Sequence, residues 1–234
     1  MLKSLQWRLS LFLYPILGGA IGFGCNATPT VTASQSTQET QNEVGVERKV
    51  ITGEHEMINE AVFAGGCFWC VEGVFRQLSG VNEVISGYTG GTAETANYRD
   101  VSSGRTRHAE AVRIIFDPEA ISFEQLLDVF FATHDPTQLN RQGPDVGAQY
   151  RSAIFYANEA QKLAATDIIR QLESEQVFTQ PIVTTLEPLE TFYVAEEYHQ
   201  DYVTCNPNQP YIVQQALPKI QKVREKFRDL VISE

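Results

Sequence analysis

Basic residues and cysteines are scarce in this chain of 234 residues. Lysine and arginine total 18 against 29 aspartates and glutamates, so the formal net charge is −11 and the isoelectric point is near 4.9. A nucleic-acid-binding domain carries a basic surface that neutralises phosphates, and this chain has no basic stripe. We therefore expect no nucleic-acid partner. The four cysteines are too few for a disulfide scaffold, so each is interpreted by its position.

The chain also lacks an apolar run of the roughly twenty residues that a membrane-spanning helix needs. The run at 9–23 is shorter, and basic residues precede it. This layout is typical of an export signal, so residues 1–25 are predicted to be a signal peptide, either cleaved or kept as an anchor. The end of the run resembles a lipoprotein processing site at which Cys25 would be lipidated, whereas cleavage after Ala33 is the competing possibility. We expect an exported protein, periplasmic or attached to the membrane.

Residues 26–59 form a second compositional segment, rich in threonine, serine, glutamine and glutamate. It has few large apolar side chains and cannot offset its ordering entropy, which predicts a flexible polar linker. Residues 60–234 show hydrophobic periodicity and suffice for one core. We therefore expect the functional domain at 60–234.

This domain mixes predicted strands and helices. Strands are predicted at 60–64, 81–88, 109–116, 152–155 and 182–187, and helices at 68–78, at 122–133, between 155 and 182, and from 218 onward. The segment 122–133 shows the apolar spacing of an amphipathic helix. Because the elements do not alternate as strict βαβ units, we predict an α+β fold, a two-layer sandwich, over a doubly wound sheet.

The most specific local feature is the segment Gly65-Gly66-Cys67-Phe68-Trp69-Cys70 between a strand and a helix. Its two cysteines lie about one helical turn apart, within the distance that a disulfide can close. The helix start favours a thiolate, so Cys67 is predicted to be a nucleophile with a lowered pKa. Cys70 would resolve an oxidised Cys67. The alternatives are a buried structural pair and half of a zinc site, although no second pair of ligands stands at metal spacing.

Glu110 is the candidate acid. Alternation along 109–116 places Glu110 on the same face as Val112, Ile114 and Phe116. An apolar face disfavours the charged carboxylate, so the pKa of Glu110 should be raised, and the group could donate a proton near neutral pH. The alternatives are an ion pair with a neighbouring arginine and an exposed strand end.

Aromatic residues near these groups have two possible roles. Phe68 and Trp69 are either core residues or an apolar cradle for a small group such as a methyl. Tyr98 and Tyr150 stand in loop-like segments, where they either donate phenolic hydrogen bonds or pack. A cysteine–histidine hydrolase built on Cys67 stays open, although the sequence marks no histidine as its partner.

Six segments along 60–234 together carry a family pattern. They are Gly65–Trp69, Gly87–Gly91, His108–Val112, His134–Thr137, Gln149–Ser152 and Ala195–Gln200. In this order they resemble the peptide methionine sulfoxide reductases of type A (MsrA). The resemblance implies a mixed β-sheet with a ferredoxin-like core and the reduction of free and protein-bound methionine (S)-sulfoxide to methionine.

The same resemblance implies a role for each candidate residue. Cys67 would attack the sulfoxide sulfur, and Glu110 would protonate the oxygen. Tyr98 and Tyr150 would hydrogen-bond that oxygen. A neutral sulfoxide is a poor electrophile until its oxygen is protonated, so the thiolate and the acid must face the same S–O bond.

The remaining roles concern the methyl group and the resolving thiol. Phe68 and Trp69 would hold the substrate methyl group, and Asp145 would shape the site. Many family members have glycine in place of Cys70 and resolving cysteines in a glycine-rich C-terminal tail, which this chain lacks. Cys70 is thus predicted to resolve the sulfenic acid, whereas Cys205 is either a second resolving thiol or a bystander.

The resemblance implies no cofactor and no metal, and it implies thioredoxin as the external thiol reductant. Oxidised proteins and free methionine sulfoxide would be the substrates, and the protein would be a monomer that meets the membrane only through its N-terminus.

No methionine follows Met57, which would keep a repair enzyme from becoming its own substrate, although chance explains this equally. A general thiol–disulfide oxidoreductase using Cys67 and Cys70 is the alternative enzyme. A tethered binding domain is the non-enzymatic alternative.

Overall fold

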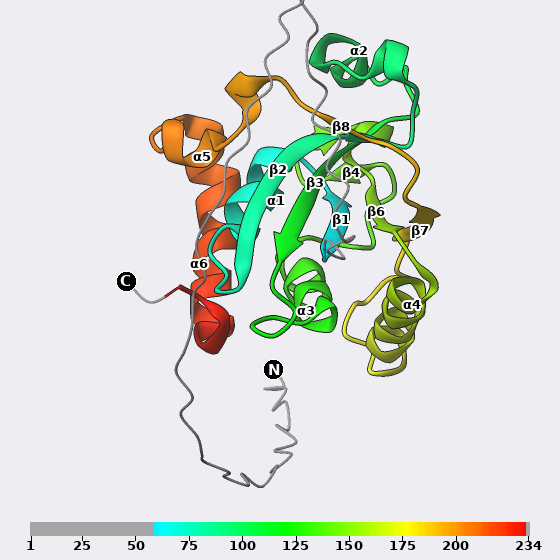
Figure 1. Ribbon diagram of the computed structural model, residues 1–234, viewed down its shortest axis with the longest axis vertical. Helices are drawn as coiled ribbons and strands as arrows, with labels where there is room; N and C mark the ends of the chain where they lie inside the picture. The colour runs from blue at the N-terminus through cyan, green and yellow to red at the C-terminus, as the bar shows by residue number, and fades with distance from the viewer. Residues whose placement is uncertain (1–58, 233–234) are drawn as a thin grey trace, which may run out of the picture. The chain divides into compact units, whose positions relative to one another are not determined.

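The computed structural model of the protein describes residues 59–232 (Figure 1). The predicted signal peptide at 1–25, and all but the last residue of the linker predicted at 26–59, lie outside the described residues. Between 59 and 232, no helix combines the length and the apolar character needed to cross a membrane.

A mixed sheet with the strand order β7-β6-β1-β3-β2-β8 forms the centre of the described part. Its strands are β1 (Glu60–Gly65), β2 (Val81–Thr89), β3 (Ala109–Phe116), β6 (Ser152–Tyr156), β7 (Thr185–Pro188) and β8 (Phe192–Val194). The helices are α1 (Phe68–Phe75), α2 (Tyr98–Ser102), α3 (Phe123–Thr133), α4 (Glu159–Ser174), α5 (Tyr202–Cys205) and α6 (Leu217–Lys226). A separate hairpin joins β4 (Arg141–Gln142) to β5 (Asp145–Val146).

The central strands reproduce a ferredoxin-like core. Along the chain, β1, α1, β2, β3, α3 and β6 follow the order β-α-β-β-α-β, and the four strands lie in the sheet order β6-β1-β3-β2. These neighbours are antiparallel, whereas β7 pairs with β6 in parallel. The prediction of an α+β fold around a mixed sheet is therefore confirmed.

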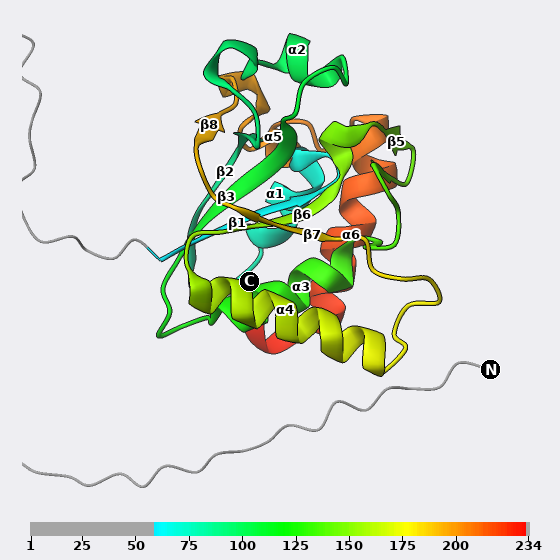
Figure 2. The ribbon, with the colours of Figure 1, turned by 90° about the vertical axis from the view of Figure 1, so that its right-hand side faces the viewer.

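Helices pack on one face of this sheet. Successive residues of β1 point to opposite faces of the sheet. On the helical face, Phe63 contacts the rings of Phe75 in α1 and Phe130 in α3. Val62 belongs to the smaller cluster on the opposite face, together with Phe192. Both ribbon views show the chain between β7 and β8 crossing the sheet, and in Figure 2 helices α3 and α4 lie below the strands.

The local sequence explains several element ends. Helix α3 begins with a capping box, in which the Ser122 side chain accepts a hydrogen bond from the Gln125 backbone and the Gln125 side chain accepts one from the Ser122 backbone. Helix α1 ends at Phe75, three residues before the predicted end, because Leu78 pairs with Val231 of the C-terminal segment. A partner about 150 residues away cannot be read from the local pattern.

Candidate active site

The turn between β1 and α1 presents Cys67. Gly66 has φ +99°, and a Cβ at this position would lie 2.7 Å from side-chain atoms of Gln142, so only glycine fits. Cys67 is the N-cap residue of α1, and its carbonyl accepts a hydrogen bond of 3.1 Å from the Cys70 backbone N–H. The predicted place of Cys67 at a helix start is confirmed.

Cys67 lines a cavity of about 240 Å³. The lining residues are Cys67, Phe68, Trp69, Tyr98, Glu110, Asp145, Tyr150, Gln209 and Tyr211. They include every residue predicted as nucleophile, proton donor or substrate contact, although these come from five separate segments of the chain. Tertiary structure therefore brings the predicted site residues together in one place.

Glu110 reaches this cavity from β3. Its side chain is buried, with 2% of the residue exposed, and accepts a hydrogen bond of 3.1 Å from the Phe68 backbone N–H. Burial raises the pKa of Glu110 to about 8, and the charge of Asp145 adds to the shift. The predicted rise is confirmed, so the carboxyl group is protonated at neutral pH. Among the described residues, no arginine forms an ion pair with Glu110.

The prediction of a lowered pKa for Cys67 is wrong. Burial raises the pKa of the Cys67 thiol well above its usual value, and the hydrogen bond with Cys70 and the charge of Glu110 act in the same direction. The loss of water around the thiol outweighs the favourable helix start. At neutral pH the Cys67 sulfur and the Glu110 carboxyl group therefore both carry a proton.

Cys70 is the neighbouring thiol. A hydrogen bond with Cys67 lowers the pKa of Cys70, and the Lys219 ammonium group adds to this effect against the opposing effect of burial. Both thiols are free and buried. Cys205 is exposed at the end of α5 and does not line the cavity. The structure thus places Cys70, and not Cys205, as the hydrogen-bonded neighbour of Cys67.

Trp69 forms an ordered aromatic wall. Its indole N–H donates a hydrogen bond of 3.1 Å to His199 Nδ1, and its ring stacks on Tyr202 with a centroid distance of 3.8 Å and an interplanar angle of 7°. Burial lowers the pKa of His199, which keeps the imidazole neutral and able to accept this bond. His199 therefore holds the Trp69 ring in place by accepting its indole hydrogen bond. No histidine among residues 59–232 lines the cavity with Cys67, so the geometry does not support a cysteine–histidine hydrolase.

Tyr98 and Tyr150 supply phenolic hydroxyls. Burial raises the pKa of both side chains, so both keep their protons and can donate hydrogen bonds. The Tyr98 backbone N–H donates to Glu196 at 2.9 Å, and the Tyr88 hydroxyl donates to the same carboxylate at 2.8 Å. Glu196 thereby holds the start of α2 against the central sheet.

Sequence reasoning missed Tyr211 and Gln209. The Tyr211 hydroxyl donates a hydrogen bond of 2.5 Å to Asp145, and hydrogen bonding by Tyr211 also acts to lower the pKa of Cys67 and of Cys70. Tyr211 follows Cys67 by 144 positions, the difference between their residue numbers. No local pattern marks Tyr211 for the site, because it meets Cys67 only in the folded chain.

The part of the chain that the structure describes contains no group of three or more histidine, cysteine, aspartate or glutamate side chains that could hold a metal ion. The half zinc site considered for the cysteine pair thus finds no further ligands within residues 59–232.

Comparison with known proteins identifies a family for this arrangement. The sequence model described as "Peptide methionine sulfoxide reductase" matches residues 59–231. Peptide methionine sulfoxide reductase MsrA of Deinococcus radiodurans is 55% identical over 170 residues, which cover 73% of this chain and 82% of the relative. The MsrA of Natronomonas pharaonis is 50% identical over 177 residues, covering 76% and 99%.

Solved structures agree with the sequence relatives. Reduced Mxr1 from Saccharomyces cerevisiae superposes with a TM-score of 0.61 at 34% identity, covering 64% of this chain and 87% of the other. Methionine sulfoxide reductase A of Corynebacterium diphtheriae superposes with a TM-score of 0.57 at 32% identity, covering 64% and 76%.

Proposed function

Because the chain belongs to the peptide methionine sulfoxide reductase family, we propose that its cavity reduces methionine (S)-sulfoxide with Cys67 as nucleophile and Glu110 as acid. The observation that carries this proposal is the placement of a buried thiol and a buried, protonated carboxyl group on one cavity. Free and protein-bound methionine sulfoxide are the proposed substrates, and repair of oxidised proteins is the proposed role.

The first step transfers oxygen from substrate to enzyme. The Cys67 sulfur attacks the sulfoxide sulfur while Glu110 donates its proton to the sulfoxide oxygen, which makes the sulfur a competent electrophile. The S–O bond of the substrate then breaks, and the hydroxyl group passes to Cys67 as a sulfenic acid. Methionine leaves reduced by two electrons, and the proton lost from Cys67 restores the acid form of Glu110.

The proposed binding mode uses three different groups on the sulfoxide sulfur. The hydroxyls of Tyr98 and Tyr150 donate to the oxygen, because both keep their protons. Phe68 and Trp69 contact the methyl group, and the rest of the side chain points to the cavity mouth. Three distinct contacts select one configuration at sulfur, and the family resemblance implies that this is the (S) epimer.

The second step forms a disulfide. We assign it to Cys70, since Cys70 is the hydrogen-bonded neighbour of Cys67, with Cys205 as a possible second relay thiol. The resulting disulfide returns to two thiols by exchange with an external dithiol, proposed to be thioredoxin. Neither step calls for a metal or a bound cofactor, and a monomer carries every residue used.

Two variants test this proposal. Cys67→Ser abolishes methionine formation from methionine sulfoxide in the presence of dithiothreitol, whereas Cys205→Ser is the matched control that retains it. Glu110→Gln discriminates against the alternative of a general thiol–disulfide oxidoreductase, because exchange with unrelated disulfides needs no proton donor to a sulfoxide. The proposal fails if Cys67→Ser reduces the sulfoxide as fast as the unaltered protein.

The proposed location follows from the N-terminal sequence alone. We propose export, with either a lipidated Cys25 or cleavage after Ala33. The mass of the mature N-terminus separates these outcomes, and an intact Met1 in exported protein supports an uncleaved anchor.

A further inference from the structure

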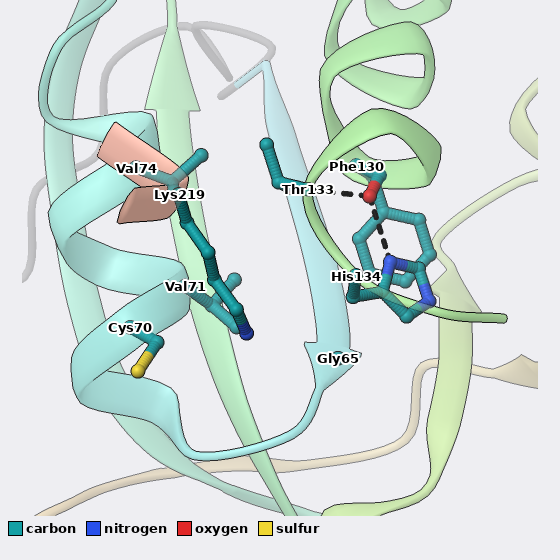
Figure 3. A pocket seen from close by; sticks show the side chains of 8 residues that line it. All are labelled: Gly65, Cys70, Val71, Val74, Phe130, Thr133, His134 and Lys219. Carbon is teal, nitrogen blue, oxygen red and sulfur yellow. Dashed lines mark hydrogen bonds between the residues drawn. The ribbon is translucent and has the colours of Figure 1, made fainter. Parts of the chain in front are cut away.

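A second, smaller cavity lies beside Cys70 (Figure 3). Its volume is about 10 Å³, close to the least space that holds one water molecule. Cys70 lines this cavity and Cys67 does not, whereas Cys67 lines the 240 Å³ cavity and Cys70 does not. The two thiols at the start of α1 therefore face different surroundings.

Lys219 supplies the charge of the smaller cavity. Figure 3 shows its side chain extending from α6 alongside α1, past Val74 and toward the first helical turn of α1, which carries Cys70. His134, on the other side of the cavity, is neutral, because burial lowers its pKa to about 4. Its ring nitrogens bond the Phe130 carbonyl at 2.7 Å and the Ser152 hydroxyl at 2.8 Å. Between residues 59 and 232, no carboxylate forms an ion pair with Lys219.

The balance of charges around Cys70 changes during the proposed reaction. A hydrogen bond with Cys67 is the largest cause of the lowered pKa of Cys70, followed among the favourable causes by Lys219 and then by Tyr211. Burial and the charge of Asp145 oppose them. Oxidation removes the proton from the Cys67 sulfur before Cys70 must attack. The first step thus removes the thiol hydrogen bond, the largest favourable cause, whereas the Lys219 charge and the Tyr211 hydrogen bond remain.

We propose that Lys219 is a positioning residue for disulfide formation, whose ammonium group stabilises the Cys70 thiolate from the side of the smaller cavity. This inference rests on the proposed function. The Cys70 thiolate attacks the Cys67 sulfur, the S–S bond forms, and the S–O bond of the sulfenic acid breaks. Hydroxide leaves and takes a proton to become water. Because Cys70 is buried, with 1% of the residue exposed, water screens the effect of the Lys219 charge on its thiolate less than at the surface.

The first experiment measures the Cys70 thiolate without any sulfoxide. Full-length Cys67→Ser protein is alkylated with iodoacetamide across pH, and the modification of Cys70 is followed by peptide mapping. In the Cys67→Ser background, adding Lys219→Met raises the half-maximal pH of alkylation. Adding Lys219→Arg in place of Lys219→Met leaves the half-maximal pH as it is in Cys67→Ser alone. Lys222→Met, an exposed lysine of the same helix, is the matched control and leaves it unchanged. An unchanged half-maximal pH in Lys219→Met overturns the inference, and Lys219→Gln replaces that variant if thermal unfolding shows that it does not fold.

The second experiment separates the two chemical steps in a single turnover. Lys219→Met releases one equivalent of methionine, but its Cys67 sulfenic acid, trapped with dimedone, persists longer than in the unaltered chain. For each tenfold loss of Cys70 thiolate, the greater nucleophilicity of the more basic thiol restores about threefold, so resolution slows by about threefold. An unchanged sulfenic acid lifetime contradicts the role of Lys219. A failure of the unaltered protein to release methionine contradicts the proposed function instead.

Discussion

Glu110 should destabilise the folded protein near neutral pH, where the proposed reaction needs its protonated form. Its pKa rises from 4.5 to about 8 on folding, because burial disfavours the carboxylate. The unfolded chain therefore releases the Glu110 proton near pH 4.5, whereas the folded chain keeps it until about pH 8. Between these values the unfolded state binds fewer protons, so the free energy of unfolding falls as pH rises, by about 1.4 kcal/mol per pH unit.

Glu110→Gln removes this titration while leaving an amide oxygen that can accept the Phe68 hydrogen bond. At pH 4 the variant and the unaltered protein should differ little. At pH 7 the window of about 2.5 pH units predicts that the variant is more stable by about 3 kcal/mol, and the gain stops growing above about pH 8. The substitution should thus remove activity and increase stability together.

Urea unfolding of both proteins at several pH values between 4 and 9 measures this difference. Glu83→Gln, on the exposed part of β2, is the matched control and should show no comparable gain. A stability difference that is independent of pH, or a Glu110→Gln variant that becomes less stable as pH rises, would refute the assignment of a buried acid with a raised pKa.

Three further predictions concern the same cavity. At pH 7 the unaltered protein should release methionine in a single turnover about 100-fold or more faster than the Glu110→Gln variant. This ratio of rates should fall as pH rises through about 8, where Glu110 loses its proton. Gly66→Ala should destabilise the protein by about 1–3 kcal/mol in urea unfolding, because a Cβ at φ +99° meets the neighbouring side chain; equal stability would contradict the crowding. Tyr211→Phe leaves the Asp145 carboxylate without its phenolic donor, so methionine release should slow by about tenfold with little change in far-UV circular dichroism, and an unchanged rate would remove Tyr211 from the site.

Local sequence was sufficient wherever the physical cause was itself local. The two-residue alternation along β3 placed Glu110 on an apolar face, and the glycines before Cys67 marked the turn that presents it. The apolar spacing of 122–133 predicted α3 to within one residue, because its capping box lies within the segment. These features depend on neighbours within about four positions.

Some elements and contacts could not be predicted because their partners lie far along the chain. The strand β8 is three residues long and exists through its pairing with β2. The hydrogen bond from Trp69 to His199 spans 130 positions, and that from Tyr211 to Asp145 spans 66. No periodicity within one segment records which distant side chain will meet it.

The sequence by itself determined the family, through motifs spread over 60–234, and it predicted Cys67 as nucleophile and Glu110 as acid. Only the tertiary structure decided in which direction the pKa of each of the two cysteines shifts. A helix start favours a thiolate, yet burial raises the pKa of Cys67, and the charge of Lys219, 149 positions after Cys70, helps to lower that of Cys70. The removal of water and the approach of a distant charge are properties of the folded core, because both depend on what surrounds a side chain in space.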